Sequence, residues 1–102
     1  MGYNTTFLPA AKSDLYAVYN WYEAQKPELG SEFINAVIKL AEELEDSVIT
    51  HRFFFQPVRY LKMKRFPYTI FYLKDELYKR IVIVGILGNK QKMLDIVKKR
   101  VG

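Results

Sequence analysis

The chain has 102 residues and a net charge of +5, half of its residues are apolar, and it contains no cysteine. This length is that of one domain, and the absence of cysteine excludes disulfide bonds and thiolate chemistry. No apolar run approaches the roughly 20 residues that cross a bilayer, and the N-terminus lacks the pattern of a signal peptide, so we expect a cytoplasmic protein that does not enter a membrane.

The charge is divided unevenly along the chain. Residues 1–50 carry 3 Lys or Arg and 8 Asp or Glu, a net charge of −5. Residues 51–102 carry 13 Lys or Arg and 3 Asp or Glu, a net charge of +10. This difference indicates that the C-terminal half meets an anionic partner, which nucleic acid or an acidic protein would provide.

The N-terminal half predicts one strand and two helices. Residues 3–8 are β-branched and aromatic, and Pro9 follows them, which favours a short strand and then a helix start. Apolar residues at helical spacing predict helices over residues 10–25 and 28–46, with Pro27 between them. Two helices with so short a connection form an antiparallel hairpin.

The C-terminal half predicts a sheet. Its apolar residues indicate three strands, over residues 58–65, 67–73 and 79–87. The last of these is apolar on both faces, as in a strand that is covered on both sides. A short helix is expected over residues 90–100. The three phenylalanines at 53–55 fit either a strand at the edge of the sheet or a loop that enters the core.

The order of these elements is β-α-α-β-β-β, followed by a short C-terminal helix. Three successive strands joined by tight turns form an antiparallel meander, and the helical hairpin covers one face of it. The sequence therefore predicts a single α+β domain over residues 1–102. Gly85, inside the last strand, indicates that another group approaches the backbone closely there.

Basic side chains crowd into the first strand of the meander and into the C-terminal tail. The candidates for contact with a partner are Arg59, Lys62, Lys64, Arg65, Lys90, Lys92, Lys98, Lys99 and Arg100. Lys62 and Lys64 share one face of their strand, whereas Arg59 and Arg65 lie on the other. The alternative is a solvated strand whose charges discourage edge-to-edge aggregation.

Other polar and aromatic residues predict no specific chemistry. His51 is the only histidine, and without further ligands at suitable spacing it indicates neither a metal site nor catalysis. Trp21 and the tyrosines are expected in or beside the core, although stacking on nucleic-acid bases is an alternative for Tyr60, Tyr68 and Tyr72. Four acidic residues end the second predicted helix, namely Glu42, Glu43, Glu45 and Asp46. We expect a solvated helix end, and the alternatives are a surface that mimics nucleic acid or one that orients a partner.

Several short motifs match one known superfamily. They are Ala11-Lys12-Ser13-Asp14-Leu15, Trp21-Tyr22, Leu29-Gly30 with Phe33, Arg65-Phe66-Pro67-Tyr68-Thr69-Ile70-Phe71-Tyr72, the strand from Ile81 to Leu87, and Arg100. With these motifs the chain resembles the RelE/ParE toxin superfamily of bacterial type II toxin–antitoxin modules over nearly its whole length. The run from Arg65 to Tyr72 is the most specific motif, and it is more similar to ParE than to RelE.

The resemblance implies a small toxin that is neutralised by a cognate antitoxin encoded beside it. RelE-like members cut mRNA on the ribosome, and ParE-like members poison DNA gyrase. The ribonucleases place an Arg after a Tyr on the third strand, an Arg after the last strand, and a Tyr or His on the C-terminal helix. Here Thr69 follows Tyr68, only Lys90 could replace the second Arg, and the C-terminal helix has no Tyr or His.

Three hypotheses follow from the residues and the resemblance. The first is a ParE-like toxin that binds a protein target such as DNA gyrase. The second is a RelE-like ribosome-dependent mRNA endoribonuclease that needs no metal, and the third is a family member that only binds its antitoxin. The replaced catalytic positions favour the first and third hypotheses over the second. None of the three implies a cofactor.

Overall fold

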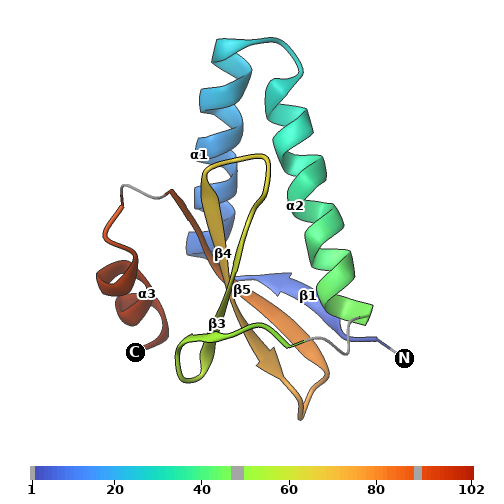
Figure 1. Cartoon of the computed structure of the whole chain (residues 1–102), viewed down its shortest axis with the longest axis vertical. Helices are drawn as coiled ribbons and strands as arrows, with labels where there is room; N and C mark the ends of the chain where they lie inside the picture. Colours follow the sequence, from blue (N-terminus) through green and yellow to red (C-terminus); the bar gives the residue numbers. More distant parts are fainter. Residues whose placement is uncertain (1, 47–49, 89–90) are drawn as a thin grey trace.

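The computed structural model of the chain describes residues 2–46, 50–88 and 91–102. Within them lie three helices, α1 (Pro9–Gln25), α2 (Leu29–Asp46) and α3 (Met93–Val101) (Figure 1). The strands are β1 (Asn4–Phe7), β2 (Phe53–Phe55), β3 (Val58–Lys62), β4 (Tyr68–Asp75) and β5 (Arg80–Gly88). In the described part of the chain, none of the helices is both long enough and apolar enough to cross a bilayer.

The strands form one sheet in the order β1-β5-β4-β3-β2. β1 runs parallel to β5, and the other neighbouring pairs are antiparallel. The predicted α+β fold with an antiparallel meander is therefore confirmed. Residues 53–55 form the edge strand β2, which was one of the two alternatives.

The helical hairpin is held together by its connection and by close packing. α1 begins at Pro9, whose missing N–H costs nothing in the first turn of a helix. The Glu23 carboxylate accepts hydrogen bonds from the backbone N–H groups of Glu28 and Gly30, both at 3.0 Å. A Cβ at Gly30 would lie 2.6 Å from the carbonyl oxygen of Tyr19, so this glycine allows the two helices to approach closely.

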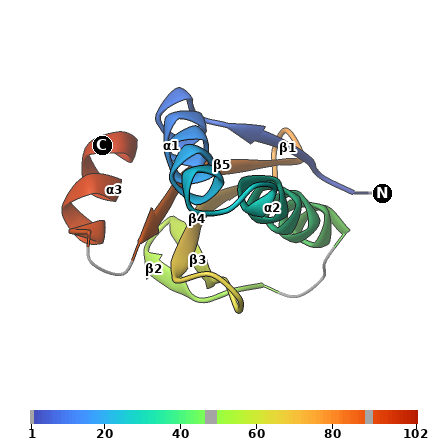
Figure 2. The same cartoon turned by 90° about the horizontal axis from the view of Figure 1, so that it is seen from above.

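The helical hairpin covers one face of the sheet, as predicted (Figure 2). At one end of this core, four rings pack with centroids between 5.1 and 6.3 Å apart, those of Tyr22, Phe33, Phe66 and Tyr68. The buried residues of this first core are Ala11, Val18, Phe33, Val37, Leu44, Met63, Phe66, Ile70, Tyr72, Ile81, Ile83 and Ile86.

A second, smaller core lies on the opposite face of the sheet, where α3 packs (Figure 2). Its buried residues are Val58, Phe71, Val84, Leu87 and Val97. β5 supplies residues to both cores, which confirms that this strand is covered on both faces.

β5 contains an irregularity that matters for the position of α3. The pairing register shifts between Phe71 and Tyr72, which leaves Val84 as one extra residue in β5. A Cβ on the next residue, Gly85, would lie 2.8 Å from Nη1 of Arg100. The close approach that was predicted at Gly85 is therefore made by an arginine side chain from α3.

Three details differ from the sequence-based expectation. β3 ends at Lys62 and not at residue 65, because the backbone N–H of Met63 donates to the carbonyl oxygen of Tyr68 at 2.9 Å and closes a turn. α3 begins at Met93, and residue 90, where the predicted helix began, lies outside the described residues. Trp21 and the tyrosines were expected in or beside the core, but Trp21 and Tyr16 are each 57% exposed on α1 and Tyr78 is 68% exposed.

Candidate functional site

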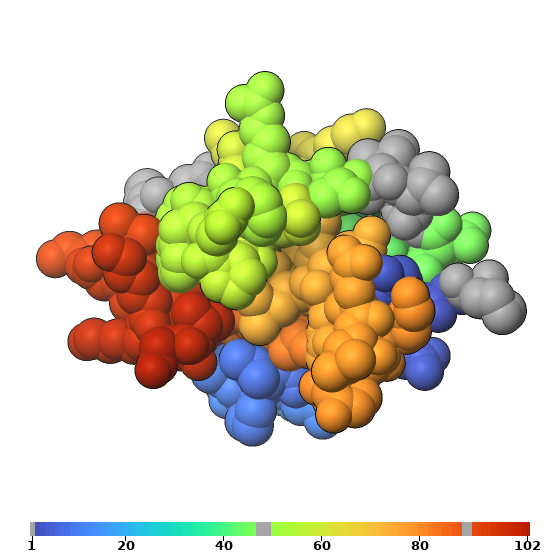
Figure 3. Space-filling model, turned by 90° about the horizontal axis from the view of Figure 1, so that it is seen from below, coloured from blue at the N-terminus to red at the C-terminus, as the bar shows by residue number. Residues whose placement is uncertain are grey.

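A cavity of about 510 Å³ lies on the face of the sheet that α3 partly covers. It is lined by Phe53, Phe54, Tyr60, Lys62, Thr69, Phe71 and Met93. Figure 3 shows α3, in red, beside the β2–β3 segment, in yellow-green, which are the elements that flank it. We call this cavity the aromatic cavity.

The register of β3 and β4 explains how the wall of the aromatic cavity forms. Tyr60 lies opposite Phe71, and Lys62 lies opposite Thr69. Residues that are directly opposite in an antiparallel pair project to the same face of the sheet. The ring of Phe54, from β2, packs on Phe71 with a centroid distance of 4.8 Å. The wall is therefore built by three adjacent strands, β2, β3 and β4.

The chemistry of the aromatic cavity is mainly apolar. Among the described residues that line it, Lys62 is the one charged side chain, and Tyr60 and Thr69 supply two hydroxyl groups. Thr69 is only 2% exposed, so it lies within the wall. A largely aromatic wall with one cation suits an apolar or aromatic side chain of a partner protein. A phosphoryl transition state would require several preorganised cations or donors.

Arg59 holds the edge of the sheet beside this cavity. Its Nη1 donates a hydrogen bond of 2.8 Å to the carbonyl oxygen of His51. Its guanidinium also lies over the ring of Phe53, 3.9 Å from the centroid. Arg59 therefore orders the segment before β2 and supports an aromatic residue of the cavity wall.

His51 makes a specific contact beneath this edge. Its Nδ1 lies 2.7 Å from the hydroxyl oxygen of Tyr72, within hydrogen-bond distance. Burial and the nearby Arg59 cation lower the pKa of His51, against a smaller opposite effect of Glu43. Burial raises the pKa of Tyr72. The lowered pKa favours the neutral form of His51, and its contact with Tyr72 connects the loop to β4.

Lys64 and Arg65 border a second hollow, on the other side of β3. It lies between the α2 residues Ala36, Lys39, Leu40 and Glu43 and the segment 61–66, and we call it the α2 groove. Arg65 forms an ion pair with Glu32, and its guanidinium lies over the ring of Phe66, 4.9 Å from the centroid. Lys62 borders both the aromatic cavity and the α2 groove.

The basic residues of the C-terminal tail do not share one surface. Lys92 and Lys99 line a depression on α3, and Lys98 is exposed. Arg100 turns inward and forms an ion pair with Asp14, with Nη1 and Oδ2 2.6 Å apart. Lys90 lies outside the described residues. The predicted basic patch is thus divided among the cavity, the groove and α3, and the partner contacts of its members stay predictions.

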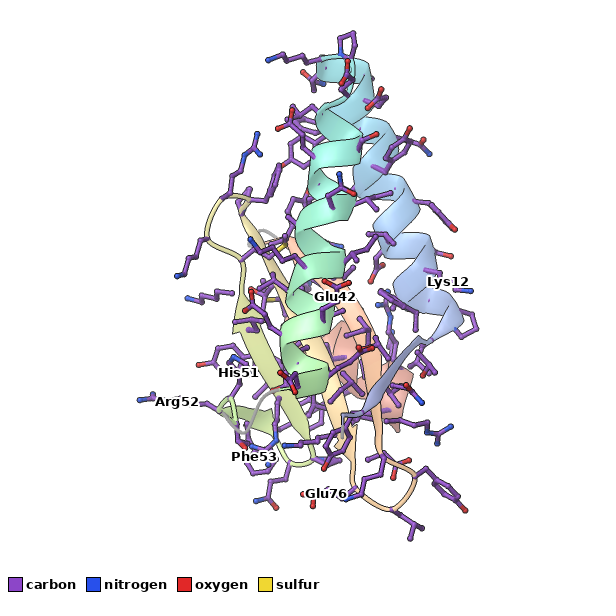
Figure 4. The ribbon with its side chains drawn as sticks, turned by 90° about the vertical axis from the view of Figure 1, so that its right-hand side faces the viewer. Lys12, Glu42, His51, Arg52, Phe53 and Glu76 are labelled. Carbon is purple, nitrogen blue, oxygen red and sulfur yellow. The ribbon has the colours of Figure 1, made fainter. Side chains whose placement is uncertain are left out.

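The acidic end of α2 has a structural role that the sequence did not indicate. The Glu45 Oε2 accepts the backbone N–H of Thr5 at 2.9 Å, and the Glu45 carbonyl oxygen accepts that of Tyr3 at 2.9 Å. Glu45 therefore provides hydrogen-bond acceptors for backbone N–H groups at the outer edge of the sheet, where β1 lies. Glu43 borders the α2 groove, and Glu42 is exposed (Figure 4). Across residues 2–46, 50–88 and 91–102, no three potential ligands among His, Cys, Asp and Glu gather as a metal site would require.

Sequence reasoning missed the aromatic cavity as a site. Tyr60 was considered only as a core residue or a base-stacking residue, and Met93 lay within the short helix expected over residues 90–100. The alternation of strand residues did contain a signal, because Tyr60 and Lys62 must share a face. The register that places them opposite Phe71 and Thr69 was not available from the alternation alone.

Comparisons with known proteins agree with this fold. A family model described as the ParE toxin of the type II toxin–antitoxin system parDE matches residues 6–93. The chain is similar to a solved chain of the chromosomal ParDE system from P. aeruginosa, with 21% identity and a TM-score of 0.72, covering 84% of this chain and 95% of that one. It is also similar to one chain of the toxin–antitoxin complex RelBE2 from Mycobacterium tuberculosis, with 15% identity and a TM-score of 0.57, covering 87% and 100%. No curated protein sequence matches the chain. Because the family model spans most of its length, the chain belongs to the ParE toxin family of type II toxin–antitoxin systems.

Proposed function

We propose that this chain is a toxin that acts by binding a protein target and that a cognate antitoxin keeps it inactive. The observation that carries the proposal is the composition of the aromatic cavity. Of the lining residues that the structure describes, four are Phe or Tyr and one, Lys62, is charged. An aromatic wall of this kind binds a partner protein by covering apolar side chains of that protein. DNA gyrase, the target implied by the resemblance to ParE-like toxins, is the first target to test.

A second function, ribosome-dependent cleavage of mRNA, has one observation in its favour. Tyr60 and Lys62 line the same cavity, so one residue with a hydroxyl proton and one cationic residue contribute to the same site. The buried residue Thr69 counts against this function. It occupies the position at which the family's ribonucleases hold an Arg, and it supplies no positive charge. We therefore place protein binding first.

The experiment that tests the proposal compares two variants of the cavity with matched controls elsewhere. Phe53→Ala removes a ring that is 41% exposed, and Trp21→Ala removes a ring that is 57% exposed on α1. Lys62→Ala and Lys12→Ala each remove an exposed lysine. Growth after induced expression, gyrase supercoiling activity and mRNA cleavage on ribosomes are measured in parallel.

Protein binding predicts that Phe53→Ala and Lys62→Ala restore growth and gyrase activity, whereas Trp21→Ala and Lys12→Ala stay as toxic as the wild type. Toxicity with unaffected gyrase and intact mRNA would leave protein binding in place but require another target. Codon-positioned mRNA cuts that vanish in Lys62→Ala would replace the proposal with the ribonuclease function. A wild-type chain that is harmless but binds its antitoxin would favour the third hypothesis, a family member without toxicity.

A further inference from the structure

The turn between β4 and β5 carries the two most exposed large apolar side chains among the described residues. Leu77 is 81% exposed and Tyr78 is 68% exposed. We call residues 76–79 the β4–β5 tip, and Glu76 shows its place at one end of the molecule (Figure 4). Adjacent apolar side chains that remain in water after folding are typical of a surface that contacts a partner.

The sequence of the β4–β5 tip is unusual for a tight turn. Residues 76–79 are Glu, Leu, Tyr and Lys, whereas Gly, Pro, Asn, Asp and Ser predominate in turns because they suit the backbone there. Lys79 has a φ of 53°, a left-handed conformation that glycine adopts without cost and other residues do not. Departures from local sequence preferences are expected at functional sites, so the side chains of this turn are expected to serve a contact.

Contacts within the hairpin hold the β4–β5 tip in one conformation. Oδ1 of Asp75 accepts the backbone N–H of Tyr78 at 3.2 Å, and Oδ2 accepts hydrogen bonds from Nε and Nη2 of Arg80 at 3.3 and 3.0 Å. The Arg80 guanidinium lies over the ring of Tyr78, 5.3 Å from its centroid. Because the ring is positioned before a partner arrives, less conformational entropy is lost when it binds.

The charges around the β4–β5 tip favour a protein over a bilayer as its partner. The ammonium groups of Lys74 and Lys79 lie 5.1 and 5.5 Å from the centroid of the Tyr3 ring, at the side of the hairpin. Asp75 and Glu76 add two carboxylates, and that of Glu76 is exposed. Anionic lipid headgroups would repel these carboxylates. An apolar pocket with polar groups at its rim, as a protein surface offers, matches the tip better.

The β4–β5 tip lies on the same face of the molecule as the β2–β3 segment that flanks the aromatic cavity. Figure 3 shows both, with the tip in orange and the β2–β3 segment in yellow-green. This view is along the longest axis, so the two shorter extents, 31 and 22 Å, bound the face. A stable protein contact covers about 800 Å² of each partner, which is comparable with this whole face. A partner that covers the edge of the cavity therefore also reaches the tip.

We propose that Leu77 and Tyr78 form a second contact with the protein target of the toxin, separate from the aromatic cavity. This inference rests on the proposed function, because it takes the target as the occupant. Leu77 and the Tyr78 ring enter an apolar pocket of the target, and the Tyr78 hydroxyl bonds a polar group at its rim. Arg80 and Asp75 are positioning residues that support the ring. Tyrosine is among the residue types that contribute most to binding energy at protein interfaces.

A binding experiment with alanine variants tests the β4–β5 tip. The probe is purified DNA gyrase, and its binding to the full chain is measured by biolayer interferometry, beside growth after induced expression. Leu77→Ala with Tyr78→Ala is the tip variant. Tyr16→Ala with Ile38→Ala removes an equally large pair of side chains, 57% and 48% exposed on the helical hairpin, and is the matched control.

We expect the tip variant to bind gyrase at least about tenfold more weakly and to lose toxicity, as is usual when residues that dominate an interface are truncated. The control should stay within about twofold of the wild type, because its residues lie outside the contact. Leu77 and Tyr78 belong to neither core, so the tip variant should unfold at the temperature of the wild type. Thermal unfolding and immunoblotting check that all variants are folded and equally abundant.

A second pair of variants tests the support of the Tyr78 ring. Asp75→Ala removes the acceptor of both the Tyr78 N–H and the Arg80 guanidinium, and it leaves the apolar side chains of the tip in place. Glu76→Ala removes the neighbouring carboxylate, with the same change of net charge and the support intact. We expect Asp75→Ala to weaken gyrase binding about threefold to tenfold through the cost of ordering the tip. Equal affinities of these two variants would overturn the role assigned to Asp75.

The outcomes separate this inference from the proposed function. If the tip variant binds gyrase and arrests growth as the wild type does, the inference is overturned, and Phe53→Ala then shows whether the proposed function stands. If the wild type arrests growth without binding gyrase, growth decides, because a harmless tip variant supports a contact with another protein target and a toxic one overturns it. If the wild type neither binds gyrase nor slows growth, the proposed function fails and the inference fails with it.

Two other occupants of the β4–β5 tip are tested with the same variants. Vesicles of phosphatidylglycerol and phosphatidylethanolamine that sediment the wild type but not the tip variant would make the tip a membrane contact. Dimers of the isolated chain that the tip variant dissociates would make it an interface between copies of this chain. Either result overturns the inference.

Discussion

Asp14 and Arg100, 86 positions apart in the sequence, form a two-point ion pair that joins α1 to α3 across β5. Nη1 and Nη2 of Arg100 lie 2.6 and 3.0 Å from Oδ2 and Oδ1 of Asp14. Both side chains also hold the bulged part of β5. The carboxylate accepts the backbone N–H of Ile86 at 3.0 Å, and the guanidinium donates to the carbonyl oxygen of Val84 at 3.1 Å. Arg100 therefore supports the position of α3, and with it that of Met93 in the aromatic cavity.

Loss of this ion pair should lower stability. Arg100→Ala leaves the Asp14 carboxylate, whose side chain is 14% exposed, with one backbone donor. We expect a loss of about 2 kcal/mol in the free energy of unfolding, in the range for hydrogen bonds to charged groups. Urea unfolding measures it, with Lys98→Ala as the control on the exposed side of the same helix. Equal stabilities of these two variants would show that the ion pair contributes nothing.

Substitution of Gly85 should act through the same arginine. A Cβ there would lie 2.8 Å from Arg100 Nη1 and 3.4 Å from Asp14 Oδ2, so Gly85→Ala displaces the guanidinium from its partners. We expect a loss of about 1–3 kcal/mol, as is usual for overpacking. The loss should shrink when Arg100→Ala is already present, because the clash is then removed. Urea unfolding of the two single variants and the double variant measures this coupling, and additive losses would contradict the assignment.

The local patterns of the sequence predicted most of the elements but not every pairing between them. Period-3.6 spacing before residue 46 and apolar strands after Pro57 are local signals, and the helices and the meander followed from them. That β1 pairs in parallel with β5 depends on contacts between distant segments, which no local period records. The short edge strand β2 stayed undecided for a related reason, since three consecutive phenylalanines carry no alternation.

The candidate site was less predictable than the fold. Composition located the basic residues along the chain but not the direction of their side chains. Arg59 and Arg100 are both turned into contacts within the chain. Arg100 was counted as a surface cation because its partner, Asp14, is 86 positions away. The opposite error occurred at Trp21, where size and hydrophobicity suggested burial but the ring is largely exposed.

Protonation of His51 should make the free energy of unfolding depend on pH in a defined window. Its pKa lies below the usual value of 6.5 in the folded chain, first because of burial and then because of Arg59. The unfolded chain therefore binds a proton at a higher pH than the folded chain does. The contribution of His51 to the stability of the folded chain is fully present above pH 6.5. It is lost as the pH falls through the lowered pKa of His51 in the folded state.

The variant His51→Asn isolates this effect. Urea midpoints are compared on either side of the histidine titration, and the decrease on acidification should be larger in the wild type than in the variant. Asp and Glu residues contribute equally to the decrease in both proteins, so the difference reports His51. The same decrease in both would show that His51 titrates alike in the folded and unfolded chains.

The last prediction concerns RNA cleavage. We expect that the isolated protein does not cut mRNA on ribosomes at the rate of the superfamily's ribonucleases. Thr69 replaces an Arg at the third strand, and loss of one preorganised electrostatic contact typically costs about 10²–10³ in rate. The C-terminal helix supplies no Tyr or His for proton transfer, a role commonly worth about 10²–10⁴. Lys62 beside the cavity and the lysines on α3 can hold RNA, but equal binding of the ground state and the transition state does not accelerate the reaction.

Primer extension on ribosome-bound mRNA, with and without the protein, measures this directly. The matched variant is Lys90→Glu with Lys92→Glu, which reverses charge in the C-terminal basic segment. In this variant we expect toxicity to weaken through poorer protein binding, with no cleavage in either protein. Because a protein contact and a phosphate contact both depend on charge, growth alone would not separate them, and the RNA readout is required. Clean codon-positioned cuts by the wild type that disappear in Lys90→Ala would show that this lysine replaces the missing arginine and that the chain is a ribonuclease.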